Sequence, residues 1–217
     1  GRSREGRRVA RSHTGALAGN DRVFSAAFQR SGIIRVSTIA QLFNSAQSLA
    51  MQPRPNGNRM AILTNAGGPA ILATDYLVAK GGELAQLTEK TYEKLSESLP
   101  VNWSHNNPVN VRGNASAEVY QTALEILLKD KNTDGVLLIL TYQANTDPEA
   151  IAEAVVKVNK RARKPILATW MGEQAVVEGR EILESGKVPH YRYPESAVDV
   201  FLRIFEYNRN LELLYET

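Results

Sequence analysis

The sequence predicts a parallel, doubly wound α/β domain, and three observations support this prediction. Short apolar runs alternate with longer segments in which apolar residues recur at helical spacing. Glycine, proline and asparagine clusters separate the two kinds of segment. The run at 135–140 is almost entirely apolar, as expected for a strand buried on both faces of a sheet. Strands alternating with helices of this length imply right-handed crossovers and therefore parallel strands.

The composition is that of a globular protein. The 217 residues suffice for one large domain or two small ones, and 43% of them are hydrophobic. We find no membrane-length apolar window and no signal peptide, so we expect a cytoplasmic protein without a membrane partner. The absence of cysteine excludes disulfides and thiolate metal sites, and the three histidines are scattered, so no metal site is predicted.

The positive charge is concentrated near the start of the sequence. The net charge is +3, and residues 1–11 contain five arginines against one acid, Glu5. A basic arm can bind nucleic acid, but no aromatic platform or recognition helix accompanies this one. We therefore expect no nucleic-acid partner.

Residues 1–19 are expected to form a loop, because they lack a periodic apolar pattern and carry four glycines. A loop normally connects two elements, and none precedes this one. We therefore expect the chain to be part of a longer protein.

A small helical unit and a linker are expected next. The expected elements are a helix from an Asn20 cap to Gly32, a strand at 33–36 and a helix from a Ser37 cap to residue 51. Two prolines and an Asn-Gly pair at 52–57 indicate a linker, and we place the domain boundary there.

Residues 59–82 are expected to form a strand, a glycine turn and a helix. The turn contains Gly67, Gly68 and Pro69, and proline suits the first turn of a helix. The glycines leave room for an anion against the free N–H groups of the helix start, where the helix dipole favours negative charge. An ordinary strand-to-helix turn explains the pattern equally well, since no Walker or dinucleotide spacing is present.

The remaining pattern completes a flavodoxin-like domain over residues 58–217. We expect strands at 83–87, 135–140, 165–170 and 190–193, an extended run at 107–111, and helices at 91–99, 117–129, 148–163, 173–185 and from a Ser196 cap onward. Ligands of such sheets bind beyond the carboxyl ends of the strands. The 65–69 turn and the segment after Asn107 should lie there.

His13 is the one histidine in a reactive setting, between Ser12 and Thr14 in a glycine-flanked stretch that follows several arginines. A neutral imidazole can act as a nucleophile toward a phosphoryl group, and nearby positive charge would stabilise that group. From spacing alone, an exposed loop histidine without chemistry is the simpler interpretation. We expect His105 and His190 to be structural.

Several blocks, in order, resemble the nucleoside-diphosphate-forming acyl-CoA synthetase family, relatives of succinyl-CoA synthetase. The blocks are SHTGALAG, DRVFSAAFQRSGIIRV, ILTNAGGPAILATD, GGELA, NNPVNVRGNA, DGVLLIL, TDPE and KPILATWMG. The resemblance implies that His13 is phosphorylated, and that Asn65, Gly67 and Gly68 hold the phosphohistidine. It also suggests supporting roles for residues near these motifs: Ser12, Thr14, Gly15, Asn107 and Asn110.

The resemblance implies a division of the chain into two parts. Residues 1–55 correspond to the C-terminal part of a second succinyl-CoA synthetase-like subdomain, and residues 58–217 to a complete flavodoxin-like one. The partners implied are a CoA-binding domain and an ATP-grasp domain, which would bind CoA or acyl-CoA and ATP/ADP with Mg. Alone, the chain is not expected to run the full cycle from acyl-CoA to ATP.

Two departures leave alternatives open. The family usually has acids where this chain has Asn110 and Asn114. If those carboxylates orient phosphate, histidine or metal, the neutral amides would weaken the activity of this copy. Residues 99–104 and 207–214 resemble bacterial fusions with a protein lysine acetyltransferase, which makes a non-catalytic, acetyl-CoA-sensing regulatory module the alternative function. A plain interaction domain without a ligand is a third interpretation.

The helices at 20–51 carry apolar faces that need a partner. Phe24, Phe28, Leu42 and Phe43 lie on these faces. We expect them to pack on the second domain or on another copy of the chain, so a homo-oligomer is predicted.

Overall fold

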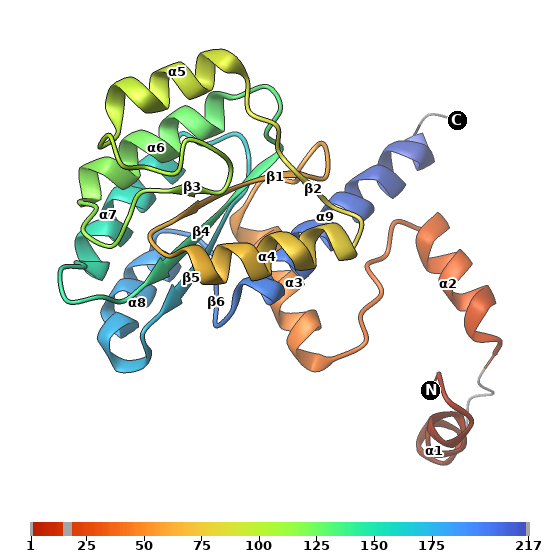
Figure 1. The fold of residues 1–217 in the computed structure, drawn as a ribbon. Coiled ribbons are helices and arrows are strands. Elements are labelled where there is room, and N and C mark those ends of the chain that lie inside the picture. The colour runs from red at the N-terminus through yellow and green to blue at the C-terminus, as the bar shows by residue number, and fades with distance from the viewer. Residues whose placement is uncertain (1, 15–18, 216–217) are drawn as a thin grey trace.

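The computed structural model describes residues 2–14 and 19–215 and shows an α/β body with a separate N-terminal helix (Figure 1). The helices are α1 (Arg4–Thr14), α2 (Asp21–Arg30), α3 (Ile39–Met51), α4 (Gly67–Ala79), α5 (Glu89–Ser98), α6 (Ala117–Lys129), α7 (Pro148–Asn159), η1 (Glu173–Val176), α8 (Val177–Ser185) and α9 (Pro194–Tyr215). The strands are β1 (Arg59–Thr64), β2 (Glu83–Leu84), β3 (Val109–Asn110), β4 (Gly135–Thr141), β5 (Ile166–Met171) and β6 (His190–Tyr191).

The strands form one parallel sheet in the order β2-β1-β4-β5-β6, and β3 also pairs with β1. β2 pairs with the first half of β1, where Arg59 lies opposite Glu83. β3 pairs with the second half, where Leu63 lies opposite Val109. The predicted doubly wound, parallel α/β fold is therefore confirmed, and β2 and β3 share one edge of β1.

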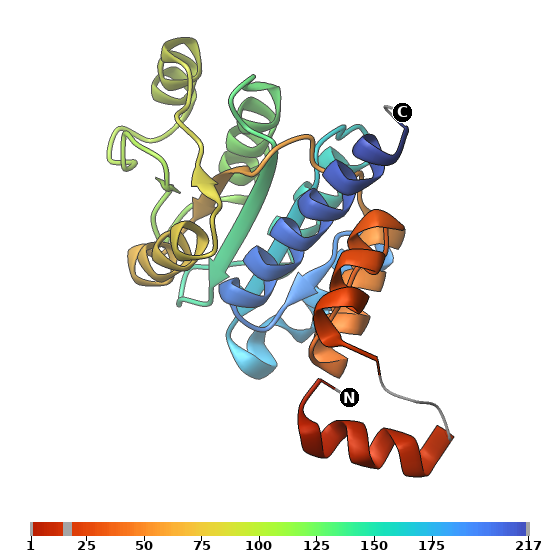
Figure 2. The same ribbon diagram turned by 90° about the vertical axis from the view of Figure 1, so that its right-hand side faces the viewer.

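Each face of the sheet has its own core, because successive side chains of a strand point to opposite faces. In β1, Met60 and Ile62 pack in a cluster with side chains of α4 and α9. Ala61 and Leu63 pack in the other cluster, with side chains of α5, α6, α7 and α8. Figures 1 and 2 show α4 and α9 on one face of the sheet and α6 and α7 on the other.

The prediction of a loop over 1–19 is wrong for α1, which lies apart from the α/β body in both views (Figures 1 and 2). Ser3 begins this helix: its Oγ accepts the Gly6 N–H at 2.9 Å, and its carbonyl accepts the Arg7 N–H at 3.0 Å. Arginine and alanine have high helix propensity. An exposed helix needs no apolar stripe, so the absence of a periodic apolar pattern did not exclude a helix here.

The predicted strand at 33–36 is also wrong, because this segment pairs with no strand of the sheet. It runs beside α2, where Arg35 donates from Nη1 to the Asp21 carbonyl at 3.1 Å and pairs through Nη2 with the Asp21 carboxylate at 2.5 Å. Its apolar residues therefore face helices instead of strands. Residues 52–58 connect α3 to β1 without regular structure, and the domain boundary there stays a prediction.

Several element ends differ from those expected. Thr38 caps α3 in place of Ser37, since its side chain accepts the Gln41 N–H at 3.1 Å. The final helix begins at Pro194, two residues before the expected cap at Ser196, because proline suits the first turn. β2 and β6 have only two residues each.

No helix in the described part of the chain, α9 included, has the length and apolar character needed to cross a membrane.

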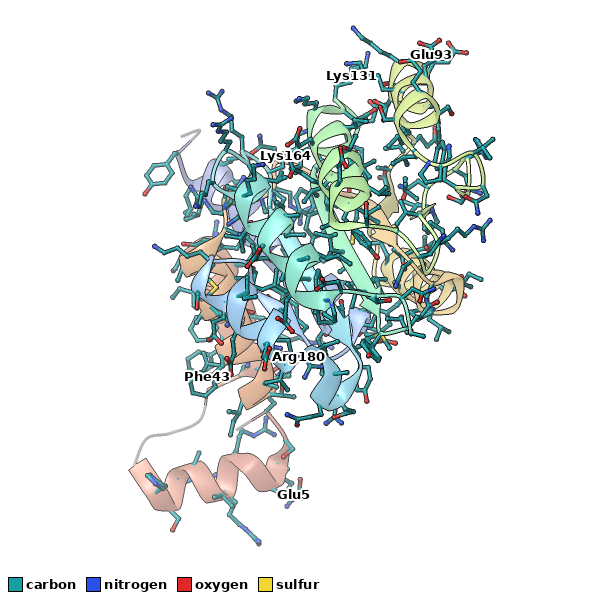
Figure 3. All side chains as sticks on the ribbon, turned by 90° about the vertical axis from the view of Figure 1, so that its left-hand side faces the viewer. Glu5, Phe43, Glu93, Lys131, Lys164 and Arg180 are labelled. Carbon is teal, nitrogen blue, oxygen red and sulfur yellow. The ribbon has the colours of Figure 1, made fainter. Side chains whose placement is uncertain are left out.

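The helices α2 and α3 run alongside α9 (Figure 2). Phe28 is half-buried at the contact with α9, whereas Phe24, Leu42 and Phe43 stay exposed. Phe43 is 67% exposed and lies at the surface in Figure 3. The expected packing on the second domain thus covers only part of the apolar faces.

Candidate functional site

The turn between β1 and α4 lies at the carboxyl edge of the sheet, where ligands of such folds bind. β1 ends at Thr64 and α4 begins at Gly67. The Ala66 N–H donates to Thr64 Oγ1 at 3.0 Å, and this hydroxyl donates to the Ala66 carbonyl at 2.9 Å. The threonine side chain therefore shapes the turn before the helix starts.

Asn65 fixes this turn to the neighbouring strand β4. Its Nδ2 donates to the Thr141 carbonyl at 2.8 Å, and the Thr141 N–H donates to its Oδ1 at 2.8 Å. The residue is 5% exposed. The oxygen and one N–H of the amide are therefore used within the protein.

This geometry makes a prediction about Asn65→Asp. A carboxylate keeps the bond from the Thr141 N–H but places a second oxygen against the Thr141 carbonyl, in a buried position. We expect a loss of about 2 kcal/mol in the free energy of unfolding, measured by urea denaturation. An Asn65→Ala variant that lost phosphate affinity but no stability would instead identify the side chain as a ligand.

The start of α4 is open. Ala66 occupies the N-cap position and has no side-chain capping bond. The N–H groups of Gly67 and Gly68 have no partner in the described part of the chain. A Cβ at Gly68 would meet nothing within 4 Å, and a Cβ at Gly67 would lie 3.7 Å from Asn110 Nδ2. Two free donors at the positive end of the helix dipole can bind an anion.

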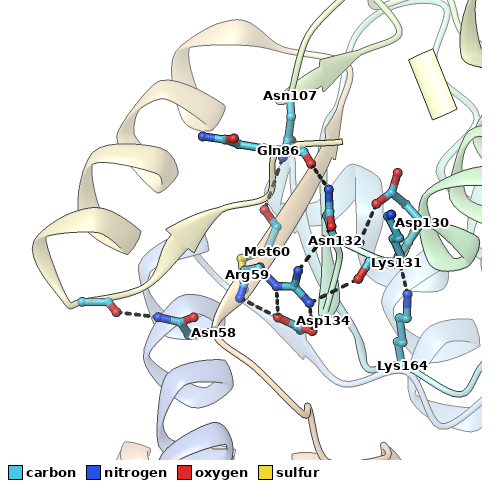
Figure 4. Close-up of polar contacts among 11 residues, drawn as sticks. Asn58, Arg59, Met60, Gln86, Asn107, Asp130, Lys131, Asn132, Asp134 and Lys164 are labelled. Carbon is cyan, nitrogen blue, oxygen red and sulfur yellow. Dashed lines mark hydrogen bonds and ion pairs between the residues drawn. The ribbon is translucent and has the colours of Figure 1, made fainter. Parts of the chain in front are cut away.

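Asn107 and Asn110 have different positions at this edge. Asn107 Oδ1 accepts the Ile62 N–H at 3.0 Å, and its Nδ2 donates to the Ala85 carbonyl at 2.9 Å. The same Nδ2 donates to the Met60 carbonyl at 3.3 Å (Figure 4). Its side chain thus fills the gap between β2 and β3 in the sheet. Asn107 is therefore a structural residue in this arrangement.

Asn110 lies beside the open helix start. Its Oδ1 accepts the Arg112 N–H at 2.9 Å, and its Nδ2 faces Gly67. An amide NH₂ can donate a hydrogen bond to an anion, whereas a carboxylate can only accept. The asparagine at this position therefore suits an anion better than an aspartate would.

Gln143 was not predicted from the sequence, and it lies two residues after the end of β4. A Cβ at Gly113 would lie 1.9 Å from Gln143 Oε1, so this side chain passes directly over a glycine. Its Nε2 lies 3.5 Å from the Asn65 carbonyl. Its place just beyond the carboxyl end of a buried strand was the signal that could have identified it.

The structure does not bring His13 to the open helix start. His13 is exposed in the last turn of α1, as is Ser12, and α1 lies away from α4 in Figures 1 and 2. Thr14 ends α1, but its side chain and the whole of Gly15 lie outside the described residues. The roles of His13, Gly67 and Gly68 in phosphoryl chemistry stay predictions. Elsewhere in the described ranges, no three His, Asp or Glu side chains converge on a possible metal position.

Two family models match the chain. A model described as the Ligase-CoA domain matches residues 60–215, and one described as the succinyl-CoA ligase like flavodoxin domain matches residues 1–49. The first model alone covers more than half of the chain.

Curated relatives are CoA ligases. The acetate–CoA ligase (ADP-forming) II subunit alpha of Pyrococcus furiosus is 36% identical over 215 residues, which cover 97% of this chain and 47% of that protein. The 4-hydroxybutyrate–CoA ligase (ADP-forming) of Nitrosopumilus maritimus is 37% identical over 198 residues, which cover 91% of this chain and 28% of that protein. The chain thus spans less than half the length of these relatives.

A solved structure has the same fold. The acetyl-coenzyme A synthetase 1 of Ca. Korarchaeum cryptofilum, in complex with phosphate and ADP, superposes with a TM-score of 0.89 at 27% identity. The match covers 100% of this chain and 47% of that one. None of these relatives is named as an acetyltransferase, so they give no support to the fusion interpretation. With a Ligase-CoA model matched over residues 60–215, this chain belongs to the Ligase-CoA family of succinyl-CoA ligase-like proteins.

Proposed function

We propose that this chain is the ligase region of an ADP-forming acyl-CoA ligase, and that the start of α4 binds a phosphoryl group. The observation that carries the proposal is the pair of unpaired N–H groups at Gly67 and Gly68, which no side chain obstructs. The curated relatives are named as ADP-forming CoA ligases, and the Korarchaeum structure is described as a complex with phosphate and ADP. These names support a phosphoryl-transfer role for this chain.

In this proposal His13 is the nucleophile. One imidazole nitrogen attacks the phosphorus of an acyl phosphate, the phosphorus–oxygen bond to the acyl group breaks, and the carboxylate leaves. The phosphohistidine oxygens then accept hydrogen bonds from the Gly67 and Gly68 N–H groups. Because α1 lies apart from α4, His13 must move to reach this position.

The proposal also requires partners. CoA and ATP/ADP with Mg would be bound mainly by a CoA-binding domain and an ATP-grasp domain outside these residues. Association between copies of the chain would cover the exposed apolar residues of α2 and α3. Acetate or another small acyl group is the substrate class that the relatives suggest.

The variant Gly68→Ala is expected to change phosphate affinity and folding stability in opposite directions. Alanine fits without a clash and favours helix, so we expect the free energy of unfolding to rise by about 0.5 kcal/mol. The new methyl group reduces access to the N–H groups, so we expect inorganic phosphate to bind at least about tenfold more weakly by calorimetry.

Lys90→Ala is the matched control, because it removes a cation from the exposed first turn of another helix, α5. We expect its phosphate affinity to equal that of the wild type. Equal phosphate affinity in Gly68→Ala and wild type, or an equal loss in Lys90→Ala, would contradict the proposed role of the α4 start.

A further inference from the structure

A basic groove lies at the carboxyl ends of α6 and α7, and its volume is about 570 Å³. Five cations line it: Lys129, Lys157, Lys160, Arg161 and Arg163. α6 and α7 end shortly before β4 and β5 begin, so the groove lies at the amino edge of the sheet. Figure 3 shows the neighbouring Lys131 and Lys164 at this end of the two helices. The groove is therefore at the opposite edge from the α4 start.

The cations of the basic groove are not neutralised within the described part of the chain. None of the five forms an ion pair there. Glu125 is the acid among the lining residues, and its Oε1 accepts a hydrogen bond from Gln121 Nε2 at 3.0 Å. The carboxyl ends of two helices favour only about one positive charge between them. The groove thus holds more positive charge than the helix ends require.

The sequence of this region is basic out of proportion to the rest of the chain. Residues 157–164 contain five cations and no acid, whereas the net charge of the whole chain is +3. Such a concentration of one sign attracts a partner of the opposite sign. Charge complementarity therefore indicates an acidic partner.

The groups that would contact this partner are open to it. All five cations are exposed. Leu128 and Ala162 also line the groove, and both are half-buried, so an apolar surface lies between the cations. A second hollow of about 440 Å³ shares Lys129 with the groove and includes Lys94 and Lys131 in its walls. The basic surface thus continues beyond one hollow, which suits an elongated ligand.

We propose that the basic groove binds an acidic amphipathic helix of a protein partner. Apolar side chains of the partner helix pack on Leu128 and Ala162, and its carboxylates face the surrounding cations. Nucleic acid fits less well, because no aromatic side chain lines the groove for base stacking. A membrane also fits less well, since the apolar residues are more buried than the cations around them and cannot insert into a bilayer.

The test is a fluorescence anisotropy titration of this chain with a labelled synthetic helix of about three turns, with leucine and glutamate at helical spacing. We expect saturable binding at low salt, with a dissociation constant on the order of 0.1 mM. A scrambled peptide of the same composition lacks the apolar stripe, and a peptide with glutamine in place of glutamate lacks the charge. We expect each of these to bind at least about fivefold more weakly.

A charge reversal in the groove locates the binding. Lys160→Glu combined with Arg161→Glu changes two exposed side chains, so the variant should fold normally. We expect it to bind the leucine–glutamate peptide at least about tenfold more weakly, because attraction becomes repulsion. Arg22→Glu combined with Arg30→Glu is the matched control. It makes the same change in net charge at exposed positions of α2, away from α6 and α7 in Figure 1, and should bind like the wild type.

Four outcomes would overturn the proposal. No binding at millimolar peptide would show that the cations are only solvated. Equal affinity in wild type and the groove variant would place the peptide elsewhere, and an equal loss in the α2 variant would reduce the effect to net charge. Tighter binding of polyuridylate or of phosphatidylserine vesicles than of the peptide would assign the surface to nucleic acid or to membrane.

The basic groove and the α4 start can be tested separately. The groove variant should keep the phosphate affinity of the wild type, because its two substitutions lie at the other edge of the sheet. Gly68→Ala should likewise keep the peptide affinity of the wild type. Failure of the groove proposal therefore leaves the proposed phosphate site untouched, and the reverse also holds.

Discussion

His13→Ala is expected to abolish phosphorylation of the intact protein by radiolabelled ATP with magnesium. Alanine has no nucleophilic nitrogen, so no phosphohistidine can form. The product should be identified by its stability, because phosphohistidine is labile in acid and stable in base. His105→Ala is the matched control, since His105 is the other exposed histidine in the described part of the chain and should leave labelling unchanged.

Three results would oppose this assignment. Label that persists in His13→Ala would place the phosphoryl group on another residue. Equal loss of label in His105→Ala would indicate a general effect on folding. An unlabelled wild type with a working nucleotide-binding domain would count against phosphoryl transfer altogether.

The second large effect is expected at the base of β1. Arg59 pairs bidentately with Asp134, through Nε at 2.7 Å and Nη2 at 2.8 Å (Figure 4). Asp134 is 8% exposed, and it also accepts the Arg59 backbone N–H at 3.1 Å. Its hydrogen bond raises the pKa of the Arg59 guanidinium, so the pair stays charged. The pair joins the starts of β1 and β4, which carry the candidate site at their other ends.

Arg59→Met leaves the Asp134 carboxylate buried and without its cation. We expect the free energy of unfolding to fall by about 3 kcal/mol, measured by urea denaturation followed by circular dichroism. The double variant Arg59→Met with Asp134→Asn should recover most of this loss, because the amide is neutral and still accepts the backbone N–H. This explanation would be contradicted if Arg59→Met were as stable as the wild type, or if the double variant were no more stable than Arg59→Met.

The sequence predicted best those elements whose side chains are buried. β4 is apolar at consecutive positions and α6 has a clear apolar stripe, and both were predicted to within one residue. α1 is exposed, so its signals were local ones, the Ser3 cap and helix propensity. The segment at 33–36 has strand-like residues, but strand formation needs a partner edge, which no local pattern can supply.

The candidate site was predictable only in part. The Gly67-Gly68-Pro69 pattern predicted an open helix start, because glycine has no Cβ and proline suits the first turn. The contacts of Asn65 with Thr141 and of Asn107 with Ile62 join residues far apart in the chain. Such pairings depend on sheet register, so the sequence could not show that both amides serve the sheet.

The most direct test of phosphate binding is a titration of the ¹⁵N-labelled chain with inorganic phosphate, followed by amide chemical shifts. We expect the Gly67 and Gly68 amide protons to move downfield together and to saturate, because both would donate to the anion. In Gly68→Ala the shift at Gly67 should need at least about tenfold more phosphate to saturate. Phosphate that leaves both glycine amides unshifted, or shifts the Gly67 amide equally in the wild type and Gly68→Ala, would contradict phosphate binding at the start of α4.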